Sequence, residues 1–260
     1  MPNNPLDRSR LHFHPLDDRE NRVHIESDAV YPPDEHRELS RELRHTISRL
    51  GERIRDARAN NRPVMLTFGA HAIKNGLSPV LIHLMEKGWV THLATNGAGI
   101  IHDWELSFLG ETSEHVERNA ARGRFGMWEE TGRYLNLALL IGAYRGLGYG
   151  ASVGTMIEQE KLMIPTRDQL KQEIERDLGK GTTPSRAGAA ADVLRVLETT
   201  DLSPGTRDIP HPYKKFSAQA AALRAGVPFT GHPMFGHDII YLHPYNYGAA
   251  IGRAAQRDFL

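Results

Sequence analysis

The clearest hydrophobic pattern near the start of the chain is an apolar stripe within residues 34–59. Its members recur at spacings of three and four, as on one face of an α-helix: they are Leu39, Leu43, Ile47, Leu50 and Ile54. The other positions are mostly Arg and Glu, and Pro33-Asp34 is a suitable helix start. The pattern predicts a long amphipathic helix over residues 34–59 that packs on something else.

Residues 1–33 show no such periodicity and carry five prolines among charged residues. We expect an irregular arm that lies on the surface or on a neighbouring subunit. The chain is therefore divided into an arm and amphipathic helix, residues 1–59, and a main domain, residues 60–260.

Two short apolar runs, residues 63–68 and 89–95, are followed by Gly69-Ala70 and by Asn96-Gly97-Ala98-Gly99. Helical patterns lie between the runs, over residues 77–87, and after them, over residues 100–109. Strand, helix, strand and helix in this order is typical of a parallel sheet. The expected fold class is α/β, a Rossmann-like parallel sheet with flanking helices, preceded by the arm and the long helix.

The remaining elements are predicted from shorter patterns. Helices are expected over residues 131–144, 166–178, 187–198, 217–225 and 249–259, and strands over 227–230 and 238–242. The glycine-rich stretch 148–154 follows no clear strand, so we interpret it as a loop between helices. Residues 179–184 are expected to form a linker and mobile loop.

Composition excludes several classes of protein. The chain has no cysteine and no net charge, with 32 basic and 32 acidic residues. Disulfides, thiolate nucleophiles, Fe–S clusters and zinc fingers are therefore excluded, and coating of nucleic acid or of an anionic membrane is disfavoured. No apolar stretch has membrane-spanning length and no signal peptide is evident, so we expect a cytoplasmic protein.

Histidine is abundant, at 14 residues, and several histidines follow predicted strands. His232 and His243 end two of them, while His102 lies one turn into the helix after another. Ligands of open parallel sheets bind beyond the carboxyl ends of the strands. Because imidazole titrates near neutral pH, His102, His232 and His243 are our candidate general bases.

The start of the helix after residue 95 is a candidate anion site. Asn96, Gly97 and Gly99 leave unpaired N–H groups near the positive end of a helix dipole, although a tight turn is the plainer interpretation. His102, with Asp103 and Glu105, could form an acid–base pair or ligate a metal, since positions i and i+3 share one helix face. His232 with His243 could also bind a metal.

Two segments carry a family resemblance: residues 68–76, FGAHAIKNG, and residues 93–103, LATNGAGIIHD, which are followed by Phe108-Leu109-Gly110. Together with residues 231–252 they resemble the deoxyhypusine synthase family, in its bacterial deoxyhypusine synthase-like branch. The resemblance implies an NAD-binding Rossmann-like fold, a homotetramer with active sites at subunit interfaces, and oxidation of spermidine with transfer of an aminobutyl group through a lysine imine. By position, it implies a cofactor site of Gly69, Asn75, Gly76, Thr95, Gly97, Gly99 and Asp103.

The chain departs from that family where the imine-forming lysine is expected, because Arg253 stands there. Arginine stays protonated and does not form an imine. We therefore expect an NAD-binding enzyme that oxidises an amine or a related small substrate, with or without group transfer. The alternatives are a metal-dependent hydrolase or lyase at the histidine-rich strand ends, and a nucleotide-binding protein without catalysis.

Overall fold

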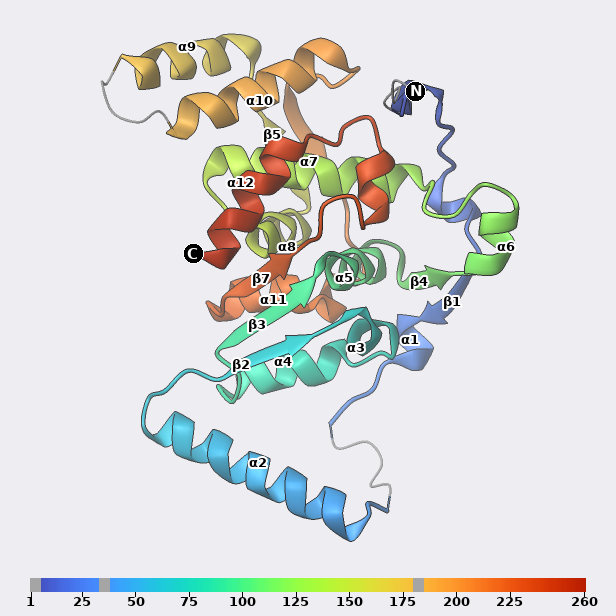
Figure 1. Cartoon of the computed structure of the whole chain (residues 1–260), viewed down its shortest axis with the longest axis vertical. Helices are drawn as coiled ribbons and strands as arrows, with labels where there is room; N and C mark the ends of the chain where they lie inside the picture. The colour runs from blue at the N-terminus through green and yellow to red at the C-terminus, as the bar shows by residue number, and fades with distance from the viewer. Residues whose placement is uncertain (1–5, 33–37, 180–184) are drawn as a thin grey trace, which may run out of the picture.

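The computed structural model describes residues 6–32, 38–179 and 185–260. Three parallel strands, β2 (Met65–Phe68), β3 (His92–Asn96) and β7 (Phe229–His232), form a sheet in the order β2-β3-β7 (Figure 1). Helices flank this sheet, so the predicted mixed α/β fold with a parallel sheet is confirmed.

The two βα units at the start of the sheet follow the sequence pattern closely. After β2 come α3 (Ala70–Lys74) and α4 (Ser78–Glu86), and β3 runs directly into α5 (Gly97–Leu109). Helix α4 is followed by Lys87 and then by Gly88, whose φ of 68° favours a residue without a side chain. Helix α5 is buried along most of its length and includes Ile100, Trp104 and Leu106, which have no exposed surface.

A group of helices from the second half of the chain builds the rest of the core. It comprises α7 (Glu129–Arg145), α8 (Tyr149–Gln159), α11 (Ala218–Ala225) and α12 (Gly248–Phe259), which pack on one another (Figure 1). The loop predicted over residues 148–154 is wrong, because α8 begins at Tyr149. A Cβ on Gly150 would lie 2.1 Å from the carbonyl oxygen of Phe229, so this glycine serves close helix–strand packing.

Two further pieces lie beside this core. An antiparallel pair, β5 (Lys161–Ile164) and β6 (Gly205–Asp208), flanks the helices α9 (Arg167–Leu178) and α10 (Ser185–Thr199). Thr166 and Gln169 form a capping box at the start of α9. Residues 180–184 of the predicted mobile loop lie outside the described residues.

The N-terminal segment is integrated into the fold rather than lying on it as an irregular arm. Its strand β1 (Asn21–His24) pairs with β4 (Glu111–Glu114), and the short helix α1 (Ile25–Asp28) follows. Leu16 and Ile25 are fully buried. Single buried side chains spaced nine residues apart give no periodicity, which is why the sequence pattern missed this packing. The 3-10 turns η1 (Arg8–Arg10) and η2 (Leu16–Asp18) precede β1, and α6 (Val116–Ala121) follows β4.

The long amphipathic helix is α2 (Arg41–Ala59). It starts after Ser40, whose hydroxyl accepts the backbone N–H of Leu43, and the predicted start at Pro33-Asp34 lies outside the described residues. Among the described residues no element packs extensively on its apolar stripe, where Leu43, Ile47 and Leu50 are about half exposed. The expectation that this helix packs on something else stays a prediction.

The strand predicted over residues 238–242 is also wrong. This segment forms the 3-10 turn η4 (Ile239–Leu242), which packs against α7. The side-chain amide of Asn136 on α7 donates a hydrogen bond of 2.8 Å to the carbonyl oxygen of Ile240. A polar group of a helix thus takes the backbone acceptor that a neighbouring strand would have used. The 3-10 turn η3 (Lys214–Phe216) precedes α11 in the chain.

Candidate active site

The carboxyl edge of the sheet brings together part of the predicted site. Asn96 and His232 are register partners at the ends of β3 and β7, and Gly69 follows β2 directly. The side-chain amide nitrogen of Asn96 lies 4.0 Å from the position that a Cβ of Gly69 would take. Gly97 begins α5 at this edge, so the strand ends and a helix N-terminus meet as predicted.

A carboxylate already lies at the start of α5. The side chain of Asn96 caps the helix by accepting the N–H of Gly99 at 2.9 Å. The carboxylate of Asp238 lies over Gly97, with Oδ2 2.0 Å from where a Cβ would stand, so a side chain at position 97 would displace it. Burial raises the pKa of Asp238, and its Oδ2 is buried with no hydrogen-bond partner among the described residues. The chain thus places its own anion where the helix dipole favours one.

Four other residues assigned to the cofactor site have structural roles within the fold: Thr95, Gly99, Gly76 and Asn75. Thr95 donates to the carbonyl oxygen of Phe68 at 2.8 Å, and a Cβ on Gly99 would lie 2.1 Å from the Thr95 hydroxyl. Gly76 has a φ of 74° and lies against the backbone of Asp28. Asn75 is the exposed C-cap of α3.

Asp103 is fully buried and faces away from the sheet edge, toward α11. Its carboxylate accepts the Ser217 hydroxyl at 2.7 Å, the Ala218 N–H at 2.8 Å and the Gln219 side-chain amide at 2.9 Å. Burial raises the pKa of Asp103, while these hydrogen bonds act in the opposite direction. The residue fixes the start of α11 on α5.

A cavity of about 260 Å³ lies beside the first turns of α5. Its lining combines charged side chains with apolar ones and includes Arg19, Lys74, His102, Glu105, Glu114 and Asp238. Of the three candidate histidines, His102 alone lines it. The carboxylate of Glu114 accepts hydrogen bonds from the side-chain amide of Asn119 at 2.7 Å and from the N–H of Gly126 at 3.0 Å. The ammonium group of Lys74 has no hydrogen-bond or ion-pair partner among the described residues.

A chain of hydrogen bonds orients His102. Its Nδ1 lies 2.7 Å from the hydroxyl of Thr112, and that hydroxyl donates to Glu105 Oε2 at 2.5 Å. The guanidinium of Arg19 donates to both oxygens of Glu105, each at 2.8 Å. Since Thr112 gives its one proton to the carboxylate, its oxygen accepts from His102 Nδ1–H. The imidazole therefore carries its proton on Nδ1 and keeps the Nε2 lone pair free.

Burial, more than the surrounding charges, keeps the imidazole of His102 neutral. Burial, helped by Lys74 and Arg19 and opposed by Glu105, lowers the pKa of His102 to about 4. Burial alone would raise the pKa of Glu105, but the ion pair and hydrogen bonds with Arg19 bring it down to about 2. At neutral pH the site therefore holds a carboxylate, a guanidinium and an uncharged histidine with a free acceptor nitrogen.

The other two candidate histidines lie elsewhere. His232 stands at the sheet edge, where its Nε2 is 2.9 Å from the Thr230 hydroxyl. His243 follows η4, is almost fully buried, accepts the N–H of Tyr245 on Nδ1 at 3.1 Å and lies with Nε2 3.3 Å from Glu129 Oε2. The sequence placed His243 at a strand end that does not exist, and the structure shows it as a buried link to α7.

Two further features of the sequence, the candidate metal pair His232 and His243, and Arg253, lie apart from the cavity site. Among the described residues, no three His, Asp or Glu side chains gather in a way that could hold a metal ion. Arg253 donates from Nε to Asp192 on α10 at 2.9 Å, so it joins α12 to α10 and does not line the cavity.

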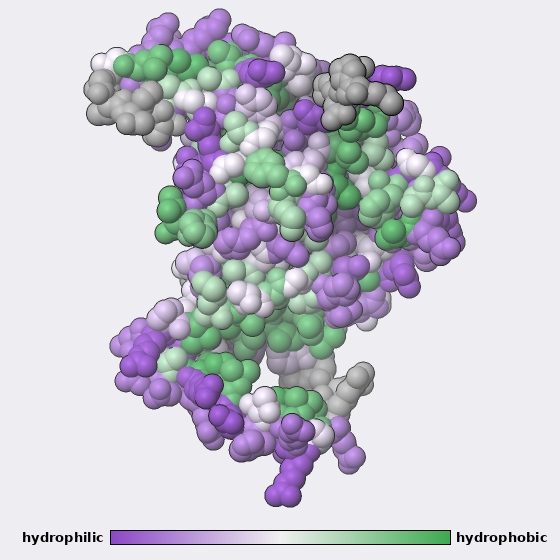
Figure 2. Space-filling model, viewed as in Figure 1, coloured by the Kyte–Doolittle hydropathy of each residue, from purple (hydrophilic) through white to green (hydrophobic). Residues whose placement is uncertain are grey.

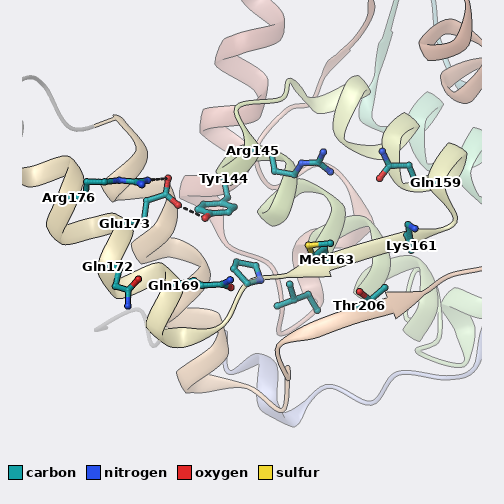
Figure 3. A pocket seen from close by; sticks show the side chains of 12 residues that line it. Tyr144, Arg145, Gln159, Lys161, Met163, Gln169, Gln172, Glu173, Arg176 and Thr206 are labelled. Carbon is teal, nitrogen blue, oxygen red and sulfur yellow. Dashed lines mark hydrogen bonds and ion pairs between the residues drawn. The ribbon is translucent and has the colours of Figure 1, made fainter.

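A larger cavity of about 720 Å³ lies away from the sheet edge, between α9, the β5–β6 pair and the ends of α7 and α8 (Figure 3). The hydroxyl of Tyr144 and the guanidinium of Arg176 both bind Glu173 at one end. Arg145 and Lys161 at the other end have no partner among the described residues. This cavity contains none of the predicted site residues.

Comparison of the chain with family models, curated proteins and solved structures finds no match. None of the helices in the described part of the chain combines the length and hydropathy needed to cross a bilayer.

Sequence reasoning missed three of the residues that organise the site: Arg19, Lys74 and Thr112. The spacing of His102 and Glu105 did predict that they share a helix face, and their side chains approach to 3.7 Å. Arg19 comes from a segment without periodicity, 86 positions before Glu105. No local signal connects such distant positions.

Proposed function

We propose that the chain is an enzyme of the deoxyhypusine synthase-like type that oxidises a small amine with NAD, with His102 as the general base. The observation that carries this proposal is the neutral, oriented imidazole of His102 at the wall of a small cavity beside the sheet edge. A neutral imidazole with a free Nε2 can accept a proton at neutral pH, and with a pKa of about 4 it is a weaker base than an ordinary histidine.

The chain of Arg19, Glu105 and Thr112 acts through His102. It fixes the tautomer in the way that a carboxylate behind a histidine does in other general-base sites. When the imidazole takes a proton on Nε2, the carboxylate of Glu105, 3.7 Å from Nδ1, stabilises the positive charge that develops. Thr112 is thus a positioning residue, and His102 is the group that meets the substrate.

The cavity suits a small amine in size, and it places the free acceptor of Asp238 and the cation of Lys74 on the same lining. Its volume of about 260 Å³ lies just under the usual range for drug-sized ligands, so a short aliphatic amine fits better than a large molecule. Asp238 Oδ2 lacks a donor and supplies the acceptor that a buried ammonium group needs. The substrate nitrogen would then lie between Asp238 and His102.

The N-terminal end of α5 suits the diphosphate of NAD, provided that Asp238 moves away from Gly97. Gly97 lets a ligand approach the backbone, and Asn96 and Gly69 frame the position. Because two anions repel at that point, Asp238 has to withdraw from Gly97 before a phosphate binds. NAD, when bound, would accept the hydride; the chain's own groups hold the amine and take its proton.

The direct test is turnover of short diamines and polyamines, followed by the absorbance of reduced NAD. His102→Gln should lower kcat by about two to four orders of magnitude, the usual contribution of a general base. His45→Gln, on the exposed α2, is the matched control and should keep full activity. Full turnover by His102→Gln would overturn the assignment of the base.

A second variant separates substrate binding from cofactor binding. Asp238→Asn should weaken amine binding because it removes the anionic acceptor, and should tighten NAD binding because it removes the competing charge. Isothermal titration with each ligand measures both effects. If neither the native chain nor Asp238→Asn binds NAD, the dinucleotide part of the proposal fails.

A further inference from the structure

The exposed face of α2 has the repeat of a coiled coil. From Leu43 onward its apolar positions are separated by alternating steps of four and three: Leu43, Ile47, Leu50, Ile54 and Ala57. These are the d and a positions of successive heptads, and such a seam is made to pack on another helix. An ordinary surface helix carries a wider apolar stripe than this seam of a and d positions.

Nothing in the described part of the chain covers this seam. Leu43 is 47%, Ile47 48% and Leu50 56% exposed, and α2 makes no extensive packing contact with another element. Figure 1 shows the helix standing off the body, and Figure 2 shows apolar residues reaching the surface along it. The end of α2 is tied to the body by Arg58, which donates to the carbonyl oxygen of Gly88 at 2.7 Å.

The residue types identify the occupant. Both a positions inside the helix are isoleucine, Ile47 and Ile54, and the first two d positions are leucine, Leu43 and Leu50. Such a seam can pack on a copy of itself about a twofold axis, because its leucine and isoleucine positions exchange places there. A second helix with matching geometry is present on every other copy of this chain. We infer that α2 packs against α2 of a second copy as a short antiparallel pair.

The flanking charges decide the orientation. The residues beside the seam are Arg44, Gly51 and Arg58 on one side and Thr46 and Arg53 on the other. A parallel pair would place Arg53 against Arg58 of the second copy, twice, and like charges across a seam are unfavourable.

The antiparallel pair avoids this repulsion. With the twofold axis between Ile47 and Leu50, Leu43 packs on Ile54 of the second copy and Ile47 on Leu50 of the second copy. Arg44 then faces Gly51, and Arg53 faces Thr46. The four central layers each pair an isoleucine with a leucine, and no flanking pair repeats a charge.

The first experiment measures the mass of the full chain in solution by light scattering over the micromolar range. The native chain should reach the mass of a dimer or of a larger even-numbered assembly. Ile47→Glu with Leu50→Glu should halve that mass, because four carboxylates would meet at the twofold axis. Ser48→Glu with Arg55→Glu, on the outer face of α2, is the matched control and should leave the mass unchanged.

The second experiment measures orientation. The chain has no cysteine, so Ala59→Cys carries a single spin label on each copy. In the antiparallel pair residue 59 lies level with residue 38 of the second copy, so the labels should be about 30 Å apart. A parallel pair would hold them within about 20 Å.

Three results would overturn the inference. They are a native chain that is monomeric at the highest concentration, an assembly that Ile47→Glu with Leu50→Glu leaves intact, and a dimer with the short label distance. Circular dichroism of the variants checks that the body remains folded, as it should, since no described element packs on the seam.

Discussion

Helices α5 and α2 are both strongly patterned in the sequence, yet they meet opposite surroundings. Along α5 the buried polar residues Asp103 and Glu105 each accept several hydrogen bonds from other elements. Along α2 the apolar residues remain half exposed and the charged ones face solvent. The comparison teaches that periodicity predicts a helix and its faces, whereas the partner of each face depends on segments far away in the chain or on another chain.

The largest expected loss of stability comes from breaking the buried ion pair of Arg19 and Glu105 behind His102. Arg19→Leu leaves the carboxylate of Glu105 buried without its cation and should destabilise the fold by about 3–5 kcal/mol. Arg49→Leu on α2, which has no partner among the described residues, should change stability by less than about 0.5 kcal/mol. Urea unfolding at neutral pH measures both, and equal effects of the two changes would break the comparison.

Apolar truncation should show a similar contrast. Leu106→Ala empties a fully buried position of α5 and should cost about 2–5 kcal/mol. Leu50→Ala removes a side chain that is 56% exposed and should cost much less when unfolding is followed at low protein concentration. A large loss of stability in Leu50→Ala that does not depend on protein concentration would mean that the body of the same copy covers α2.

Acid should weaken the α5 region in two steps. The folded-state pKa of His102 is about 4, below its ordinary value of 6.5, so the unfolded chain binds the proton first and stability falls between pH 6.5 and 4. The folded-state pKa of Glu105 is about 2 against 4.5, so further stability is lost as pH falls from 4.5 toward 2. Urea midpoints across this range measure the slope, which should be shallower above pH 4 in His102→Gln.

The smallest effects concern the helix caps. Asn96→Ala removes the cap of α5 and should cost about 1 kcal/mol of global stability. Ser40→Ala removes the cap of α2 and should fray only that helix, because little else depends on it. Hydrogen exchange resolves the two, since only the first change should accelerate exchange throughout the core.

The sequence allowed prediction of elements whose signals are local. Strands β2 and β3 and most of helix α5 were predicted, because apolar runs bounded by glycine and asparagine are short-range features. The helix begins at Gly97, three residues before the predicted start. The stretch 148–154 was not predicted as a helix, because its glycines serve helix packing, a role that looks like a loop signal in one dimension. The 3-10 turn η4 was missed for a related reason: the carbonyl oxygen of Ile240 accepts a hydrogen bond from Asn136, a distant residue on α7.

The site divided in the same way. His102 and Glu105 were found from their spacing on one helix. His243 was misplaced because a strand was assumed before it, and Asp103 was assigned to a ligand although α11 holds it. Arg19 and Thr112 could not be found, since their roles arise when an N-terminal segment and β4 fold onto α5.

The most direct test of the proposed base is a nitrogen-15 and carbon-13 NMR titration of the His102 ring in the whole chain. The account predicts a neutral imidazole protonated on Nδ1 at neutral pH, with a pKa of about 4, and a change of tautomer in Thr112→Val. A His102 ring that titrates near 6.5, or that carries its neutral proton on Nε2 in the native chain, would contradict it.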